Sequence, residues 1–384
     1  MSSVFGLPSS VQILTVFPKH SILLSERNRN FSSSFRKSVK VDAKKPRPSL
    51  HNVAQRAGVS PATVSRVLNN TAPVRDVVRT RVLATISELG YAPPGRSAQR
   101  AIENAIALLI SDILNPFFAE VFRGVQDEAS ALGFLPILYD STEDAQRERQ
   151  FLRAFASQPL RGMILCGSRL ASTELSSFCQ ASRVPIVLIN RTLRCPHVAC
   201  ILTNLEEGAW RAARHLLDLN HARIAFLSGP IRSEQSQARR RGVERALTEA
   251  GLILRPELCP ASNPNSDGGF QAMSALLTLP AADRPTAVIA YNDMMALGVL
   301  NAIRAHHWRV PEDISVIGAD DIAIAAHANP PLTTITQPKY RMGRTAMQVL
   351  QRMIQGRPPP EDGYTLMESA LIVRESTAPA NNGK

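Results

Sequence analysis

Apolar residues recur at helical spacing in three short runs between residues 49 and 91. The first run, His51–Ala57, ends at Gly58, a residue type that readily takes the left-handed conformation terminating many helices. A second helix is expected to begin at Pro61, because Ser60 before it can act as an N-cap. The expected buried positions are Val64, Val67 and Leu68 in the second helix and Val78, Val82, Ile86 and Leu89 in the third.

Short apolar β runs alternate with amphipathic helices from residue 105 onward. The strands are predicted at Ile106–Ile110, Leu135–Tyr139, Gly162–Cys166, Ile186–Ile189, Ala199–Leu202, Ile224–Leu227, Ala287–Ala290 and Ser315–Ile317. Helices are predicted at Phe117–Leu132, Asp144–Ala156, Glu206–Leu219, Arg239–Ala250 and Asp293–His306. This alternation predicts parallel sheets with helices on both faces, and it has more units than one sheet comfortably holds.

The first of these regions has the pattern of a DNA-binding motif. Two helices joined by a short turn with glycine are typical of a helix-turn-helix, whose second helix enters the major groove. The alternative is a small helical bundle that binds protein or nothing. The charge distribution favours DNA: of 44 Lys and Arg and 32 Asp and Glu, the first hundred residues hold 16 and 4. The whole excess of +12 therefore lies there, and a basic head on a neutral body is typical of a polyanion binder.

Length and composition restrict the class further. A chain of 384 residues can form two or three domains. It has no apolar run of about 18 residues that could span a membrane. Its five cysteines are odd in number and scattered, which indicates reduced thiols and a cytoplasmic protein.

Signatures of common enzymes are absent. The sequence has no G-x-S-x-G, H-E-x-x-H, G-x-G-x-x-G or Walker motif. The pair Asp320-Asp321 has no accompanying nucleophile, and Cys195, His197 and Cys200 are too few for a closed zinc site. We therefore expect no catalytic residue, no metal and no cofactor.

Polar residues do follow the predicted strands, where open α/β sheets bind ligands. The pairs are Ser111-Asp112, Asn190-Arg191, Thr203-Asn204, Asn292-Asp293 and Asp320-Asp321. Their amides, carboxylates and guanidinium groups suit a polyhydroxyl ligand, and Phe117 and Phe118 could cover a sugar ring. Structural roles remain open: Asn292-Asp293 and Asp320-Asp321 could cap helices, and the phenylalanines could belong to the core.

Five motifs carry a resemblance to a known family: NVAQRAGVSPATVSRVLN, NPFFAEVFRG, PTAVIAYNDMMALGVL, VPEDISVIGADD and PPLTTITQP. Through them the chain resembles the lac repressor (LacI/GalR) family of bacterial transcription regulators from Ser49 to Ser376. The resemblance implies a small all-α helix-turn-helix head and an α/β body. The body would consist of two doubly wound parallel-sheet subdomains of periplasmic-binding-protein type, with Thr333–Thr336 recrossing toward the first.

The expected domains follow from this resemblance. They are an N-terminal extension at 1–45, the head at 46–92, a hinge or linker at 93–104, the effector-binding and dimerisation domain at 105–377, and a polar tail at 378–384. The extension is serine-rich and poor in acids, and it is expected to be a disordered tail or the product of a misassigned start codon.

The family hinge folds on operator DNA and inserts a leucine into the minor groove. The corresponding positions here are Ala98, Gln99, Ala101 and Ile102, after a double proline and Gly95. Because Ala101 or Ile102 stands in the region of the leucine, a plain linker remains the alternative.

The resemblance also implies which residues bind. The DNA-binding candidates are Leu50, His51, Ser60, Pro61, Ala62, Thr63, Ser65, Arg66 and Asn69, with Arg66 expected to contact a base edge, most plausibly guanine. The effector-binding candidates are Asp112, Asn115, Phe117, Phe118, Asn190, Arg191, Arg239, Asn292, Asp320 and Gln337. Ala319 replaces a usual aromatic residue, which predicts a wider pocket or a different ligand.

The predicted function is a homodimeric repressor that reads a roughly palindromic operator, since a two-fold dimer requires two half-sites. A sugar or sugar derivative, bound between the subdomains, would control operator affinity. The chain lacks a C-terminal heptad leucine segment, which favours a dimer over a tetramer. The alternative is a sugar-binding transport protein or sensor without DNA function, which would not need the basic head.

Overall fold

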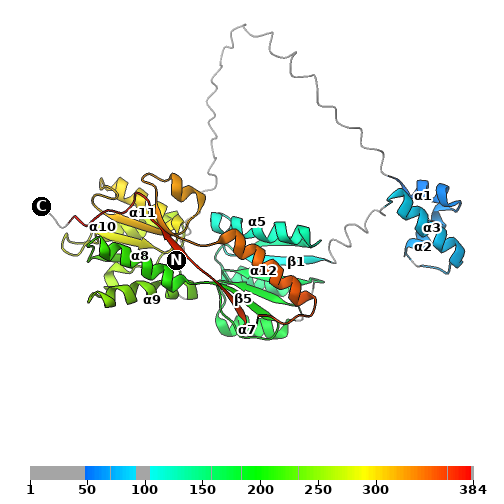
Figure 1. Cartoon of the computed structure of the whole chain (residues 1–384), viewed down its shortest axis with the longest axis horizontal. Helices are drawn as coiled ribbons and strands as arrows, with labels where there is room; N and C mark the ends of the chain where they lie inside the picture. Colours follow the sequence, from blue (N-terminus) through cyan, green and yellow to red (C-terminus); the bar gives the residue numbers. More distant parts are fainter. Residues whose placement is uncertain are drawn as a thin grey trace, which may run out of the picture. The chain divides into compact units, whose positions relative to one another are not determined.

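The computed structural model describes residues 48–69, 71–91, 104–156, 158–182, 184–231, 233–360 and 362–381. The chain divides into two compact units, Met1–Ala92 and Pro93–Lys384, which are described separately below (Figure 1). The expected extension at 1–45 and the hinge residues Ala98, Gln99, Ala101 and Ile102 lie outside the described residues.

The first unit contains the three expected helices: α1 (Leu50–Ala57), α2 (Pro61–Asn69) and α3 (Asp76–Leu89). Ser49 and Asn52 form a reciprocal capping box at the start of α1, and Gly58 ends that helix at φ 63°. One apolar cluster joins the helices, formed by Val53, Ala54, Ala57, Val64, Val67, Leu68, Val82 and Tyr91. This small core fixes the orientation of α2 relative to α1 and α3.

The second unit contains two sheets. The first sheet is wholly parallel, in the order β10-β5-β4-β3-β1-β2. Its strands are β1 (Ala105–Ile110), β2 (Leu135–Asp140), β3 (Gly162–Cys166), β4 (Ile186–Ile189), β5 (Val198–Thr203) and β10 (Tyr364–Met367). The second sheet has the order β11-β9-β8-β7-β6, in which only β11 is antiparallel. Its strands are β6 (Ile224–Leu227), β7 (Ala287–Ala290), β8 (Ser315–Asp320), β9 (Thr333–Thr336) and β11 (Ala370–Ile372).

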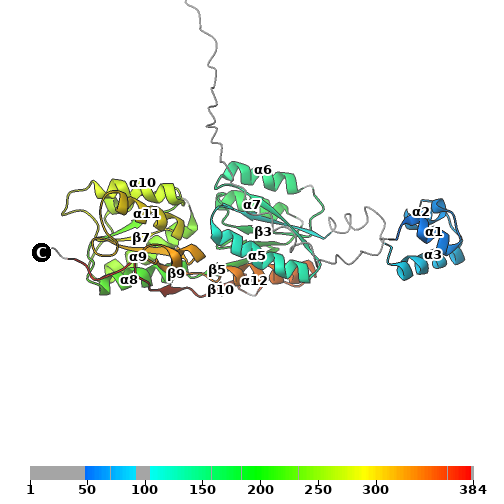
Figure 2. The same ribbon diagram turned by 90° about the horizontal axis from the view of Figure 1, so that it is seen from above.

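Helices cover both faces of each sheet, which explains the continuous apolar runs of the strands (Figure 2). Alternate residues of β1 contact opposite layers: Ile106 packs with α5 and α12, and Ala107 with α6 and α7. In the second sheet α10 and α11 lie on one face, and α8 and α9 on the other. The helices are α5 (Pro116–Ala131), α6 (Ala145–Ala156), α7 (Ser172–Ala181), α8 (Leu205–Asp218), α9 (Glu234–Glu249), α10 (Ser266–Leu277), α11 (Asp293–Ala305) and α12 (Lys339–Ile354), with 3₁₀ turns at Pro256–Leu258 and Ala323–His327.

The chain passes between the two subdomains three times: after β5, after β9 and after β10. The expected recrossing toward the first subdomain occurs at the end of Thr333–Thr336, directly after β9. This segment pairs with β8 on one side and β11 on the other, so its backbone hydrogen bonds are satisfied within the second sheet. The crossing follows at residues 337–338, after which α12 packs against α5 of the first subdomain.

All eight strand segments expected from the sequence are strands in the structure, with some boundaries shifted by one to three residues. The sequence did not predict α7, α10, α12, β10 and β11. Among the described residues, no helix is both long and apolar enough to cross a membrane.

Candidate DNA-binding surface and effector pocket

The surface of α2 opposite the core of the head is polar and accessible. Pro61, Ala62, Arg66 and Asn69 are exposed, while Thr63 and Ser65 are half-buried. Among the described residues Arg66 has no ion-pair partner, whereas the nearby Arg56 binds Glu88 at 2.7 Å. The guanidinium of Arg66 therefore extends into solvent from a helix whose other face is fixed by packing.

The remaining head candidates have local roles or lie beside α2. The Ser60 hydroxyl accepts a hydrogen bond from the Thr63 amide at 3.1 Å, which caps α2 as expected. The Asn69 amide donates to the Ser65 hydroxyl at 3.3 Å. His51 is exposed, and Leu50 packs partly against the helical core.

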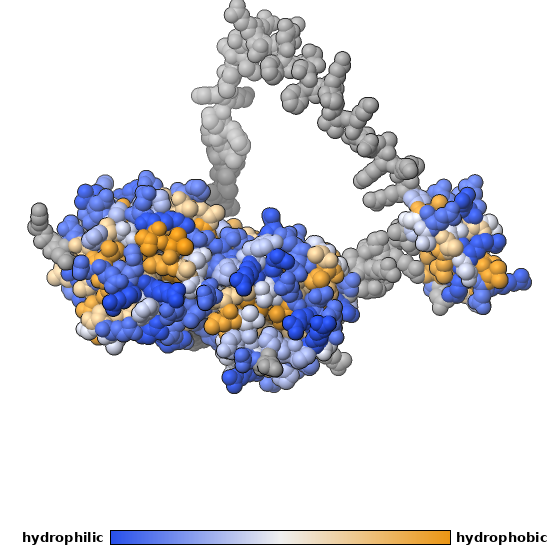
Figure 3. Space-filling model, viewed as in Figure 1, coloured by the Kyte–Doolittle hydropathy of each residue, from blue (hydrophilic) through white to orange (hydrophobic). Residues whose placement is uncertain are grey.

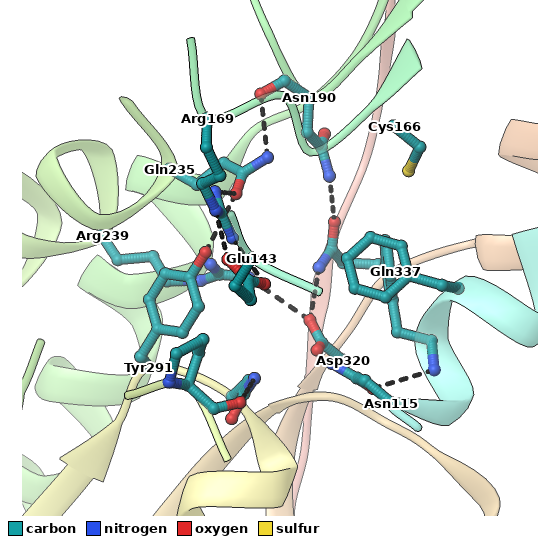
Figure 4. Close-up of a pocket in the computed structure, with 14 residues that line it drawn as sticks. Asn115, Glu143, Cys166, Arg169, Asn190, Gln235, Arg239, Tyr291, Asp320 and Gln337 are labelled. Atoms are coloured by element: carbon teal, nitrogen blue, oxygen red, sulfur yellow. Dashed lines mark hydrogen bonds and ion pairs between the residues drawn. The ribbon is translucent and has the colours of Figure 1, made fainter. Parts of the chain in front are cut away.

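In the second unit a pocket lies between the two subdomains, at the carboxyl ends of their strands (Figure 4). Eight of the ten effector candidates line it, namely Asn115, Phe117, Phe118, Asn190, Arg239, Asn292, Asp320 and Gln337. The other lining residues are Glu143, Cys166, Arg169, Gln235, Pro264 and Tyr291. The pocket thus combines side chains from both sheets, as a ligand that holds the subdomains together requires.

A chain of hydrogen bonds runs through the pocket from the first subdomain to the second. The Asn190 amide donates to the Gln337 oxygen at 2.9 Å, and the Gln337 amide donates to Asp320 Oδ1 at 2.6 Å. Arg239 Nη2 donates to the same carboxylate oxygen at 3.3 Å. Gln337 lies in the second crossover segment. The hydrogen bonds therefore link the end of β4 to the end of β8 through this crossover (Figure 4).

Lys339 stabilises the turn that contains Asp320. Asp320 and Asp321 have φ values of 110° and 53°, a conformation that non-glycine residues rarely adopt. The Lys339 ammonium donates to their carbonyl oxygens at 2.8 and 2.6 Å and lies 3.6 Å from Glu120 Oε1 in α5. These contacts stabilise the turn. Asp320 lines the pocket, and the 3₁₀ turn that follows has Ile322 at its N-cap position.

Burial raises the pKa of two carboxyl groups at this site. The pKa of Asp320 rises to about 6, since desolvation outweighs the opposing effects of Arg239, Gln337 and Lys339. The pKa of Asp293 rises to about 8, because desolvation comes first and the neighbouring Asp320 adds repulsion. Asp293 accepts hydrogen bonds from the Thr334 hydroxyl at 2.6 Å and the Ile322 amide at 2.9 Å.

A second ion pair lines the pocket at Arg169. Its guanidinium makes two hydrogen bonds to the Glu143 carboxylate, one of them Nη2 to Oε1 at 2.9 Å. Its Nη1 lies 3.4 Å from Gln235 Oε1, across the cleft in the second subdomain. The sequence analysis missed this pair, although Arg169 follows a predicted strand and the strand-end rule could have found it.

Aromatic side chains provide the apolar part of the lining. The rings of Phe117 and Phe118 meet edge to face with centroids 5.2 Å apart. Tyr291 lies 4.6 Å beneath the guanidinium carbon of Arg239 and donates its hydroxyl hydrogen to Gln235 at 2.9 Å. Both phenylalanines are also buried in the core, so the core role and the lining role coexist.

Asn115 and Asn292 likewise have two roles. Asn115 caps α5 by accepting from the Phe117 amide at 3.0 Å, and Asn292 caps α11 by accepting from the Met295 amide at 2.8 Å. The Asn292 amide also donates to the Pro264 carbonyl at 2.9 Å. Both side chains nevertheless line the pocket.

Three residues singled out for the pocket lie away from its lining. Asp112 is absent from the lining, because its carboxylate accepts from the Leu114 amide at 2.9 Å and closes the loop after β1. Arg191 binds the Leu170 carbonyl at 2.9 Å and Glu234 at 3.1 Å, and is likewise absent from the lining. Ala319 packs in the apolar cluster under α8 and α9 and is absent from the lining.

The described residues contain no group of three or more His, Cys, Asp or Glu side chains that could hold a metal ion. The three cysteines nearest one another, Cys179, Cys195 and Cys200, all have a thiol pKa raised by burial.

Comparison with known proteins agrees with this geometry. The profile of bacterial regulatory proteins of the lacI family matches residues 49–94, and that of the periplasmic binding protein-like domain matches residues 213–377. The HTH-type transcriptional repressor CytR of Escherichia coli K12 is 35% identical over 344 residues, covering 88% of this chain and 99% of that protein. The HTH-type transcriptional repressor PurR of Aliivibrio fischeri MJ11 is 34% identical over 310 residues, covering 80% and 92%.

Solved structures give the same result. The lac repressor dimer bound to operator and the anti-inducer ONPF matches with a TM-score of 0.70 and 28% identity, covering 86% of this chain and 99% of that chain. The transcriptional regulator CelR in complex with cellobiose matches with a TM-score of 0.65 and 32% identity, covering 86% and 100%. The chain is a two-part regulatory protein with a helix-turn-helix and a periplasmic-binding-protein-like body. It belongs to the lacI family of bacterial regulatory proteins.

Proposed function

We propose that this protein is a sequence-specific DNA-binding repressor whose operator affinity is controlled by a small effector. The observation that carries the proposal is the pairing of an accessible α2 surface bearing Arg66 with a polar pocket between two subdomains. The relatives named above are called transcriptional repressors, which supports a regulatory and non-enzymatic role.

On the DNA side, Arg66 hydrogen-bonds a base edge, and the small side chains of Pro61 and Ala62 approach thymine methyl groups. Ser60, Thr63, Ser65 and Asn69 donate to phosphate oxygens and set the register of the helix, beside Leu50 and His51. The hinge positions Ala98, Gln99, Ala101 and Ile102 approach the minor groove. The basic residues around the head supply the non-specific affinity, which weakens as salt rises.

The proposed active form is a cytoplasmic homodimer on a roughly palindromic operator. The lac repressor structure named above is described as a dimer bound to operator. Apolar side chains lie exposed on the body, including Leu135 and Ile137 on the edge strand β2 and Leu114, which is 80% exposed. Figure 3 shows apolar patches on both subdomains amid a mostly hydrophilic surface. A second copy that covers the edge of β2 would remove such side chains from water.

On the sensor side, the effector is a sugar or sugar derivative bound between the subdomains. CelR is described in complex with cellobiose, and a further lacI-family regulator, from Enterococcus faecium, with ribose. A ligand that contacts Asn190 and Asp320 together favours the closed arrangement, because it binds that state better than the open one. The three crossovers transmit this change within the body, and the coupling is reciprocal between effector and operator.

Selection of binding sites from a random duplex library tests the proposal. The full chain is expected to enrich a two-fold symmetric sequence, and addition of the correct sugar is expected to change its affinity for that sequence. Recovery of the starting library without enrichment would rule out sequence-specific repression.

A further inference from the structure

The charged side chains of the effector pocket form two separate pairs. Arg239 binds Asp320 on the side of the second subdomain, and Arg169 binds Glu143 on the side of the first. These four are the only charged residues in the described lining, so the lining has no net charge while both carboxylates are ionised. Figure 4 shows both pairs among the labelled side chains of the pocket, with Gln235 beside Arg169 and Tyr291 beside Arg239.

The positively charged side chains around the pocket also have hydrogen-bond or ion-pair partners. Lys339 is held by two carbonyl oxygens and approaches Glu120, and Arg191 binds Glu234. The Asp293 carboxyl group, next to Asp320, accepts hydrogen bonds from the Ile322 amide and the Thr334 hydroxyl. Among the described residues, no guanidinium or ammonium group at this pocket is left to neutralise a phosphate or carboxylate.

An anionic ligand would therefore have to displace Glu143 or Asp320 from its arginine, or lie close to both carboxylates. Either arrangement is unfavourable in a buried pocket, because like charges repel more strongly where water is excluded. A neutral polyol avoids this problem, since each ion pair can share its remaining donors and acceptors with hydroxyl groups.

We propose that the effector is an uncharged, hydroxyl-bearing ring compound, and that Arg169 and Glu143 form a second recognition pair opposite Arg239 and Asp320. The inference rests on the proposed function and specifies its ligand class. Arg169 contacts the second subdomain through Gln235, so a ligand held by this pair also bridges the cleft.

The test compares neutral and phosphorylated members of matched pairs: ribose and ribose 5-phosphate, glucose and glucose 6-phosphate, adenosine and its 5′-phosphate. Thermal unfolding of the full chain is followed in phosphate-free buffer at constant ionic strength, and binding is confirmed by calorimetry. A neutral member is expected to stabilise the wild type, and its phosphate to bind at least about tenfold more weakly. Tighter binding of the phosphorylated member, or no stabilisation by any neutral compound, overturns the inference.

Two variants sharpen the result. Glu143→Gln leaves Arg169 without its carboxylate, so the preference for the neutral member over its phosphate is expected to fall by about tenfold or more. The control Glu174→Gln removes a carboxylate that binds Arg149 outside the pocket, and the preference should not change. An unchanged preference in Glu143→Gln contradicts the role of the pair.

Operator binding without any compound separates the two hypotheses. If the chain selects a duplex sequence but its ligand is anionic, only the inference about the ligand fails. If it selects none, the proposed function fails whatever the pocket binds.

Discussion

Arg239 Nη2 lies 3.3 Å from Asp320 Oδ1, and both side chains are more than nine-tenths buried at the end of β8. Arg239 belongs to α9, and Asp320 belongs to a turn whose carbonyl oxygen accepts a hydrogen bond from Lys339. Three separate segments of the chain therefore position this ion pair. Burying such a pair is costly, and charged groups with a shifted pKa in a cleft are common at functional sites.

Asp320→Asn is expected to abolish the effector response while operator binding remains. The amide keeps the shape of the carboxylate but carries no negative charge and has an NH2 donor in place of one acceptor oxygen, so it pairs less strongly with Arg239 and the ligand. A gel shift on the selected operator, titrated with the effector, measures both properties. Asp283→Asn, which removes an acidic group paired with Arg255 at the surface, serves as the control. An unaltered titration curve would remove Asp320 from the site.

Asp293 predicts a pH dependence of stability. Its pKa is raised in the folded state from 3.8 to about 8, so between these values the native state holds a proton that the unfolded state releases. The free energy of unfolding therefore falls as pH rises through this window, by at most about 1.4 kcal/mol per pH unit. Asp320, with a pKa of about 6, also lowers the free energy of unfolding as pH rises from about 4 to 6.

The variant Asp293→Asn isolates this effect, because an amide does not titrate. Its stability relative to the wild type is expected to rise from pH 5 to pH 8 in urea denaturation. The two histidines with lowered pKa, His215 and His221, act in the opposite direction but contribute equally to both proteins. Asp267→Asn in the exposed first turn of α10 is the control. A stability difference that stays constant over this range contradicts the assignment.

Arg66→Ala is expected to cost about 1–3 kcal/mol of discrimination between operator and random duplex. Arg66 has no ion-pair partner among the described residues, so its loss should leave the thermal stability of the head unchanged. Ser65→Ala, in contrast, should lower the affinity for operator and random duplex by the same factor, as expected for a phosphate contact. Fluorescence anisotropy with both duplexes separates the cases, and an equal loss at both for Arg66→Ala excludes base contact.

Gly343→Ala is expected to destabilise the first subdomain by roughly 1–3 kcal/mol or more. A Cβ at this position would lie 2.1 Å from the Val121 carbonyl oxygen, and the same close approach occurs at Gly124 against Tyr340. The two glycines allow α12 and α5 to pack backbone to backbone, which fixes the crossover that carries Gln337. Chemical denaturation measures the loss, with the exposed Arg341→Ala as the control. Equal stability of both variants would show that the helices can separate without cost.

The architecture was predictable because its signals are local. Helical periodicity, Ser60-Pro61 and Gly58 predict the head, and the apolar runs of the strands predict two parallel sheets. Elements whose pattern is weak were missed: β10 has exposed residues at Tyr364 and Leu366. The predicted start of α9 at Arg239 is five residues later than its start at Glu234 in the structure. The recrossing near β9 was predicted, but the pairing of this strand with β11 was not, because the sequence did not reveal β11.

The pocket was predictable only in part for a related reason. The rule that polar residues at strand ends face a ligand succeeds where a side chain points outward, as at Asn190, and fails at Asp112, which satisfies its own loop. Arg169 lies in the loop after a predicted strand, so the strand-end rule could mark it as a candidate, but its pairing with Glu143 depends on how the loops after β2 and β3 fold together.

The most direct test of DNA recognition by the head is an anisotropy titration of the full chain. The selected palindromic duplex is compared with a scrambled duplex of equal composition at about 150 mM salt. We predict at least about 10³-fold tighter binding to the palindrome. Equal affinity for both duplexes, or no binding to either, would contradict sequence-specific DNA recognition by the head.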